Sequence, residues 1–130
     1  MKLLLDTHAF LWAVEGSARL GRAARRRMQR ADAVYVSAAS LLEIALKMSS
    51  GKLRLKLASG QSLDTLVTDA GFEELAVRGV HATAVLGLPL VHGDPFDRLL
   101  VAQARVEGLT LVTADEVLHS FGVPVLDASI

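Results

Sequence analysis

The stretch KLLLDTHAFLWAVEG, residues 2–16, places two different patterns on either side of one acid. Its first part, residues 2–5, is a continuous apolar run after a lysine, which is typical of a strand buried in a parallel sheet. The second part has a helical pattern, with Thr7 as the predicted N-cap and Gly16 as the stop signal. The stretch therefore predicts a strand and a helix joined at Asp6.

The rest of the chain repeats this alternation of strands and helices. Strands are predicted at residues 33–36, 72–77, 109–113 and 123–127, and helices at 20–32, 38–51, 61–71, 79–88, 94–108 and 114–122. Residues 52–60 alternate apolar and basic side chains, which fits a short strand or an extended loop. We expect one α/β domain spanning residues 1–130, with a central parallel sheet flanked by helices on both faces.

Composition narrows the class of protein. The 52% hydrophobic and 22% charged content of the 130 residues excludes a disordered chain. The absence of cysteine excludes disulfides and thiolate metal sites, and the net charge of +0 gives no overall field toward nucleic acid. No apolar run approaches the roughly 20 residues of a membrane span, so a cytoplasmic protein without a membrane partner is expected.

Two acids directly follow predicted strands. Asp6 comes after LLL, and Asp115 comes after LTLVTA. Parallel α/β sheets bind their ligands outside the carboxyl ends of the strands, so we expect these carboxylates to converge at one edge.

The stretch HGDPFDRLLVAQA, residues 92–104, contains two further acids. Asp94 at N-cap, Pro95 at N1 and Asp97 at N3 make a strong helix start, so capping alone would account for both acids. Their predicted position at the carboxyl edge of the sheet favours a functional role beside the strand-end acids.

Glu43 lies among apolar neighbours on a predicted helix. It could form an exposed pair with Lys47 four residues later, or point into a cleft. Several converging carboxylates cannot all stay ionised without compensation, and Mg²⁺ or Mn²⁺ supplies it. Such a site suits phosphodiester hydrolysis by an activated water.

Four segments in order resemble the PIN-domain ribonucleases, and more narrowly the VapC-type toxins of bacterial toxin–antitoxin pairs. They are LLLDTHAFLWAV with Asp6, VYVSAASLLEIALKMSSGKL with Glu43, HGDPFDRLLVAQA with Asp97, and GLTLVTADEVLHSFGVPVL with Asp115. The resemblance covers almost the whole chain, and residues 52–79 are its least similar part.

The resemblance implies a PIN-like domain and a Mg²⁺- or Mn²⁺-dependent endoribonuclease that a cognate antitoxin inhibits. It implies that Asp6, Glu43, Asp97 and Asp115 are both catalytic residues and metal ligands. It also implies that three further residues orient these ligands without binding the metal themselves: Thr7, Asp94 and Thr113. A homodimer is also implied.

Several basic side chains are candidates for RNA contact. Lys47 and Lys52, which lie on and after the helix of Glu43, are predicted to bind RNA, together with Arg98 beside Asp97. The arginines of the second predicted helix form either a solvated face or a contact surface for phosphate or antitoxin. They are Arg19, Arg22, Arg25, Arg26, Arg27 and Arg30. Structural roles are expected for His8 and for His92, which lies near the proposed cleft.

Other classes fit less well. A haloacid-dehalogenase-like phosphatase needs a second aspartate two residues after the first, and His8 stands there. A response-regulator receiver needs a phosphoacceptor aspartate ending the third strand and a lysine ending the fifth, and neither is evident. A catalytically weak PIN-like protein that binds RNA or a partner remains the alternative.

Overall fold

The computed structural model describes residues 1–90 and 93–130, so the expectation for His92 lies outside the described residues. Its elements, in chain order, are β1 (Lys2–Leu5), α1 (Thr7–Glu15), α2 (Arg22–Arg30), β2 (Ala33–Ser37), α3 (Ala38–Ser49), α4 (Leu63–Asp69), β3 (Glu73–Leu75), α5 (Gly79–Val85), α6 (Pro95–Glu107), β4 (Thr110–Thr113), the 3₁₀ helix η1 (Glu116–Phe121) and β5 (Val125–Asp127). Within these ranges no helix is long and apolar enough to cross a membrane.

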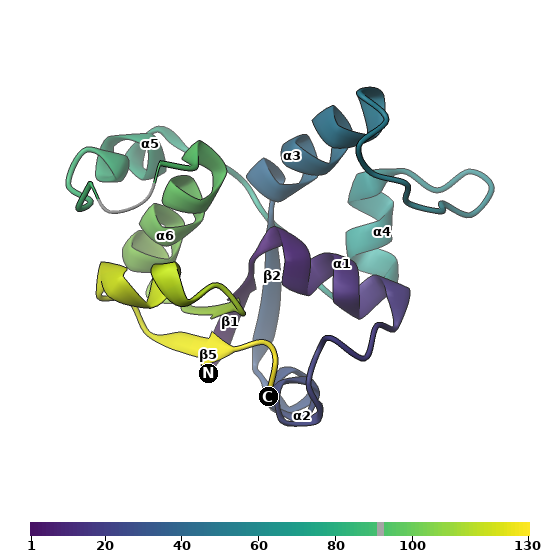
Figure 1. Cartoon of the computed structure of the whole chain (residues 1–130), viewed down its shortest axis with the longest axis horizontal. Coiled ribbons are helices and arrows are strands. Elements are labelled where there is room, and N and C mark those ends of the chain that lie inside the picture. Colours follow the sequence, from purple (N-terminus) through teal and green to yellow (C-terminus); the bar gives the residue numbers. More distant parts are fainter. Residues whose placement is uncertain (91–92) are drawn as a thin grey trace.

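The strands form one parallel sheet in the order β3-β2-β1-β4-β5. β1 is central and pairs with β2 on one side and β4 on the other, with Leu5 opposite both Val36 and Val112. All five strands therefore end at the same edge of the sheet. α1 and α4 lie on one side of β1 and β2, and α5 and α6 lie on the other (Figure 1).

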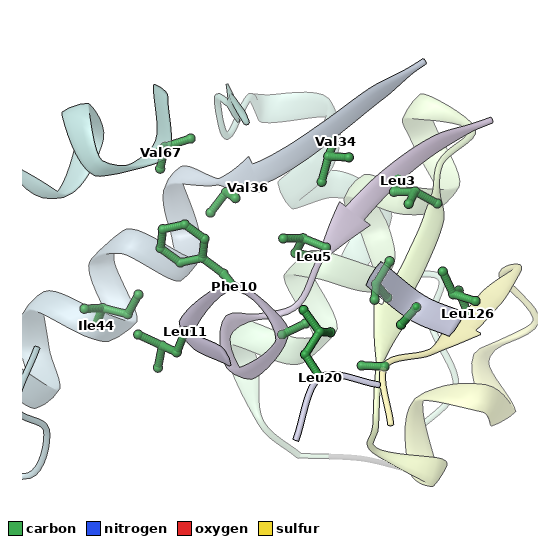
Figure 2. Close-up of a cluster of buried hydrophobic side chains, with 14 residues drawn as sticks. Leu3, Leu5, Phe10, Leu11, Leu20, Val34, Val36, Ile44, Val67 and Leu126 are labelled. Atoms are coloured by element: carbon green, nitrogen blue, oxygen red, sulfur yellow. The ribbon is translucent and has the colours of Figure 1, made fainter. Parts of the chain in front are cut away.

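Alternate residues of β1 supply two separate cores. Leu3 and Leu5 are fully buried in a cluster with Phe10 of α1 and Ile44 of α3 (Figure 2). Leu4 points to the opposite face, where it joins a cluster formed largely by α6 and η1. Burial on both faces explains why β1 is a continuous apolar run. The expected parallel sheet with helices on both faces is confirmed.

Some local predictions were wrong in detail. The N-cap of α1 is Asp6, not Thr7, because the Asp6 carboxylate accepts a hydrogen bond from the Ala9 amide at 2.8 Å. α5 ends at Val85 rather than at residue 88, because residues 86–88 continue as tighter i→i+3 turns. The last predicted helix is a short 3₁₀ turn.

Residues 52–60 take the loop alternative and form no strand. Leu53 and Leu55 pack against the core cluster of Phe10, while Lys52, Arg54 and Lys56 are exposed. The alternation thus reflects an extended segment lying on the protein surface, with its leucines inward and its basic side chains in solvent.

The start of α2 is completed by the carboxyl-terminal segment. Gly21, at the N-cap, has no side chain to cap the helix. The Gly21 amide donates to the Ala128 carbonyl at 2.9 Å, and the Ala24 amide donates to the Ile130 carbonyl at 3.0 Å. Residues 128–130 therefore satisfy amides that would otherwise lack partners.

We predict that Gly21→Ala destabilises the protein by about 1–3 kcal/mol, the range for overpacking a close contact. A Cβ at Gly21 would lie 1.9 Å from the Ile130 carbonyl oxygen, so the terminal segment must move. Chemical denaturation measures the loss. Gly79→Ala is the matched control, since a Cβ there meets nothing within 4 Å, and it should be neutral or stabilising. Equal losses in the two variants would contradict the capping role of the terminal segment.

Candidate active site

Asp6 joins the first strand to the first helix and lies buried at the carboxyl edge of the sheet. One carboxylate oxygen caps α1 through the Ala9 amide. The other accepts a hydrogen bond from the Thr113 hydroxyl, at the end of neighbouring β4, at 2.6 Å. The first turn of α1 and the end of β4 thus hold this carboxylate from two sides.

Burial raises the pKa of Asp6 above its ordinary value, 3.8. The hydrogen bonds from Thr113 and Ala9 and the charge of His8 act in the opposite direction, while the charge of Asp97 adds to the rise. Burial therefore outweighs these hydrogen bonds and the charge of His8, and the ionised form of the Asp6 carboxylate is disfavoured. The effect of Asp97 also places the start of α6 within electrostatic reach of Asp6.

Glu43 approaches the same edge from α3. Its side chain is buried, and its Oε1 accepts a hydrogen bond from the Thr7 hydroxyl at 2.7 Å. The Thr7 hydroxyl lies 3.0 Å from that of Ser40, one turn before Glu43 on the same helix. Thr7 directly follows Asp6 in the chain, so it connects α3 to the end of β1.

The Lys47 ammonium donates to Glu43 Oε2 at 2.9 Å. This hydrogen bond raises the pKa of Lys47, and the charges of Glu43, Asp94 and Asp97 act in the same direction. Lys47 is therefore within the electrostatic field of acids on both α3 and α6. The expected i, i+4 pair forms, but Glu43 is buried rather than exposed. The alternative, a side chain that points into a cleft, stays a prediction.

Asp94 is the N-cap of α6, and its Oδ1 accepts from the Phe96 amide at 2.8 Å and the Asp97 amide at 3.1 Å. Pro95 occupies N1, as expected. The capping role of Asp94 is thus confirmed. Asp97 is half-buried in the first turn, where the helix dipole favours a negative charge.

Asp115 follows β4 and is tied to Asp6 through one residue. Its amide donates to the Thr113 hydroxyl at 3.0 Å, and that hydroxyl donates to Asp6. Its Oδ1 accepts from the Val117 amide and so starts the 3₁₀ turn. Asp115 therefore has a capping role, like Asp94, as well as a place at the carboxyl edge.

All four predicted ligands are carboxylates, which are the oxygen donors that a hard divalent cation prefers, and Asp6 among them is buried. Across residues 1–90 and 93–130, however, no three histidine or acidic side chains are grouped so that they could hold a metal ion. The acids are linked instead through the hydroxyls of Thr7 and Thr113 and through Lys47. The four-acid metal site stays a prediction.

The predicted RNA-binding side chains differ in their exposure and in their contacts. Lys52 is exposed just beyond α3, whereas Lys47 is engaged by Glu43. The Arg98 guanidinium donates to the Pro89 carbonyl at 2.8 Å and so links α6 to Pro89.

The arginine-rich helix α2 lies away from the acids, at the opposite end of the view from α3 (Figure 1). It ends just before the amino end of β2, and the Asp32 amide there donates to the Met1 carbonyl. Arg25 donates to the Ser17 carbonyl at 2.6 Å, which gives it a structural role. These contacts do not bring the arginines to the candidate site.

Sequence reasoning missed Ser40, a fully buried hydroxyl behind Thr7. The available signal was its spacing of three residues from Glu43, which places both on one helix face. The expectation of a structural role for His8 is not tested directly; its side chain is exposed, and its charge lowers the pKa of Asp6.

We predict that Asp6→Asn makes the metal-free protein more stable at neutral pH. A raised carboxyl pKa in the folded state means that stability is lost as pH rises from the unfolded value, 3.8, through the folded value. Asparagine removes that loss and can still cap α1. Thermal melting in chelator across this pH range should show the variant gaining on the unmodified protein as pH rises. A constant difference at all pH values would contradict the prediction.

The chain was compared with protein families and with known proteins, and both comparisons gave a match. The PIN domain family matches residues 3–123. Ribonuclease VapC22 of Mycobacterium tuberculosis is 34% identical over 125 residues, which cover 94% of this chain and 93% of that protein.

Solved structures agree in fold. DNA-bound VapBC from Salmonella typhimurium is similar with a TM-score of 0.68 at 18% identity, covering 98% of both chains. A toxin–antitoxin complex from Klebsiella pneumoniae is similar with a TM-score of 0.64 at 16% identity, covering 97% of both chains.

The five-stranded parallel sheet, with Asp6 buried at its carboxyl edge, defines an α/β protein. The family match covers nearly the whole chain, and so does the similarity to VapC22. The chain belongs to the PIN domain family.

Proposed function

We propose that this protein is a metal-dependent endoribonuclease and the toxin of a toxin–antitoxin pair. Its membership of the PIN domain family and its 34% identity to Ribonuclease VapC22 support RNA as the substrate class. The similarity to a toxin–antitoxin complex from Klebsiella pneumoniae supports an inhibitory protein partner.

The observation that carries the proposal is the Asp6 carboxylate, which is buried at the carboxyl edge of the sheet and held by the Thr113 hydroxyl and the Ala9 amide. Its pKa is raised by burial in spite of hydrogen bonds from Thr113 and Ala9, and Asp97 adds further negative charge. A site that only stabilised the fold would gain by replacing such a carboxylate with a neutral side chain. In a cation-dependent reaction, the negative charge of Asp6 would bind the cation.

Asp6, Glu43, Asp97 and Asp115 would hold Mg²⁺ or Mn²⁺. A cation bound there would act as a Lewis acid and promote attack of water on a phosphodiester. Thr113 orients the Asp6 carboxylate.

Around these ligands, the Thr7 hydroxyl orients Glu43. Asp94 holds the first turn of α6, so that the Asp97 side chain is presented from a fixed helix start. Thr7 thus acts on the Glu43 carboxylate itself, whereas Asp94 acts on the main-chain amide of Asp97.

For RNA binding we propose Lys47, Lys52 and Arg98, which lie on or near the two helices that carry Glu43 and Asp97. Lys52 has an exposed side chain and can contact phosphate directly. Arg98 also donates to the Pro89 carbonyl, so its replacement would remove this contact as well as a positive charge.

A homodimer is part of the proposal and rests on the family resemblance. Leu42 and Leu46, one turn apart on α3, have 54% and 53% of their surface exposed, so this helix has apolar surface available for a second copy.

The proposed function is tested by incubating purified protein with a panel of structured cellular RNAs in Mg²⁺ or Mn²⁺. We expect discrete cleavage products that disappear when the protein encoded beside it as its antitoxin is added. RNA binding without cleavage under every metal condition would favour the alternative of an inactive PIN-like binding protein.

A further inference from the structure

The pairing of Lys47 with Glu43 differs from an ordinary surface ion pair. Only 9% of the Glu43 side chain is exposed, whereas 42% of the Lys47 side chain is. Their nitrogen and oxygen atoms lie 2.9 Å apart. A largely buried carboxylate thus receives its compensating charge from a side chain that is anchored on the protein surface.

Both carboxylate oxygens of Glu43 already accept a hydrogen bond. Oε1 accepts from the Thr7 hydroxyl at 2.7 Å, and Oε2 accepts from the Lys47 ammonium. Thr7 is neutral and buried, so it can support Glu43 with or without a bound cation. Lys47 is the positive partner, and a second cation at Oε2 would have to replace it or share the oxygen with it.

The field at Lys47 does not come from Glu43 alone. The charges of Asp94 and Asp97, at the start of α6, also act on the ammonium. Lys47 thus contacts Glu43 on its own helix and also lies within the electrostatic field of two acids at the start of α6. Of these three acids, Glu43 and Asp97 are proposed metal ligands. Lys47 supplies part of the positive charge that a divalent cation would supply.

We propose that Lys47 is an internal counter-ion, which neutralises the acid site of the metal-free protein and is displaced from Glu43 when a divalent cation binds. The inference rests on the proposed metal site. Because the lysine is partly exposed, its ammonium can leave into water without any change in α3. The lysine therefore lowers the affinity for metal, and it stabilises the fold while the metal is absent.

The test measures Mn²⁺ binding to the whole protein by isothermal titration calorimetry, without RNA. Replacing the lysine by an uncharged side chain, in Lys47→Met and independently in Lys47→Gln, should tighten Mn²⁺ binding about tenfold, because a competing positive charge is removed. In chelator the same variants should melt at a lower temperature, and Mn²⁺ should raise their melting temperature by more than that of the unmodified protein.

Two controls separate competition from general charge effects. Lys2→Met removes the same charge at the amino edge of the sheet, where Lys2 is exposed, and should change the Mn²⁺ affinity by less than about twofold. Lys47→Arg keeps the charge and should bind Mn²⁺ as weakly as the unmodified protein does.

The possible results are distinguishable. If Mn²⁺ binds the unmodified protein but its affinity in both uncharged variants stays within twofold, Lys47 is an ordinary helix-surface pair and the inference is overturned. If Mn²⁺ binds neither the unmodified protein nor the variants, the proposed metal site fails and the inference fails with it. A lower melting temperature without tighter Mn²⁺ binding shows a purely structural lysine and also overturns the inference.

Discussion

Replacing Asp97 by asparagine is expected to reduce RNA cleavage by about 1,000-fold or more, the scale on which removal of a metal ligand acts. The same change should leave the melting temperature in chelator unchanged or higher. Asp97 adds negative charge to a site where burial already disfavours the ionised form of Asp6, so its neutralisation relieves repulsion. Cleavage of labelled RNA and thermal melting, measured on the same preparation, test both halves.

Asp94→Asn is the matched control on the same helix start. Asparagine caps a helix about as well as aspartate, so the hydrogen bonds to the Phe96 and Asp97 amides can be kept. We expect cleavage to fall by no more than about tenfold. A large loss of stability in Asp97→Asn, with cleavage falling only in proportion to unfolding, would make Asp97 a structural residue and remove it from the proposed ligands.

The second large effect concerns the chemistry of the products. A carboxylate site favours attack by water, which leaves a 5′-phosphate and a 3′-hydroxyl, whereas histidine acid–base chemistry would pass through a 2′,3′-cyclic phosphate. Cleavage should stop completely in excess EDTA and return with Mg²⁺ or Mn²⁺. Ca²⁺ should support it poorly, because its larger and more flexible coordination places water less accurately.

End-group analysis of the RNA fragments decides between the two routes. A cyclic phosphate, or full cleavage in EDTA by protein freed of contaminating nuclease, would refute the assignment of all four acids at once. His8 is the residue to replace in that case, because its charge acts on Asp6 and its side chain is exposed.

The fold was predictable largely because its central strands are buried on both faces. A short, continuous apolar run such as residues 2–5 is typical of a strand covered on both sides, and the runs that became β2 and β4 were located for the same reason. Residues 52–60 were ambiguous, because alternation of leucine with lysine and arginine describes both a strand and an extended segment on a core surface. Only tertiary packing selects between these alternatives.

The acids of the candidate site could be picked out from the sequence, but their contacts could not. The positions of Asp6 and Asp115 after strands indicated one edge, and the sheet order places both there. The cap of α1 was assigned to Thr7 because threonine is a common N-cap, whereas its hydroxyl is used 36 residues away by Glu43. Spacing along the chain could not reveal that the lysine of a local pair also lies within the field of acids on α6.

The order of the strands also determines when the candidate site can form while the chain is being synthesised. The hydrogen bond between Thr113 and Asp6 joins residues 107 positions apart, and β1 cannot gain its β4 neighbour until residues 110–113 have left the ribosome. A nascent chain therefore carries Asp6 without the partner that orients it until β4 has been made. The carboxyl edge at Asp6 is thus completed only after β4 has been made, although β1 can pair with β2 much earlier.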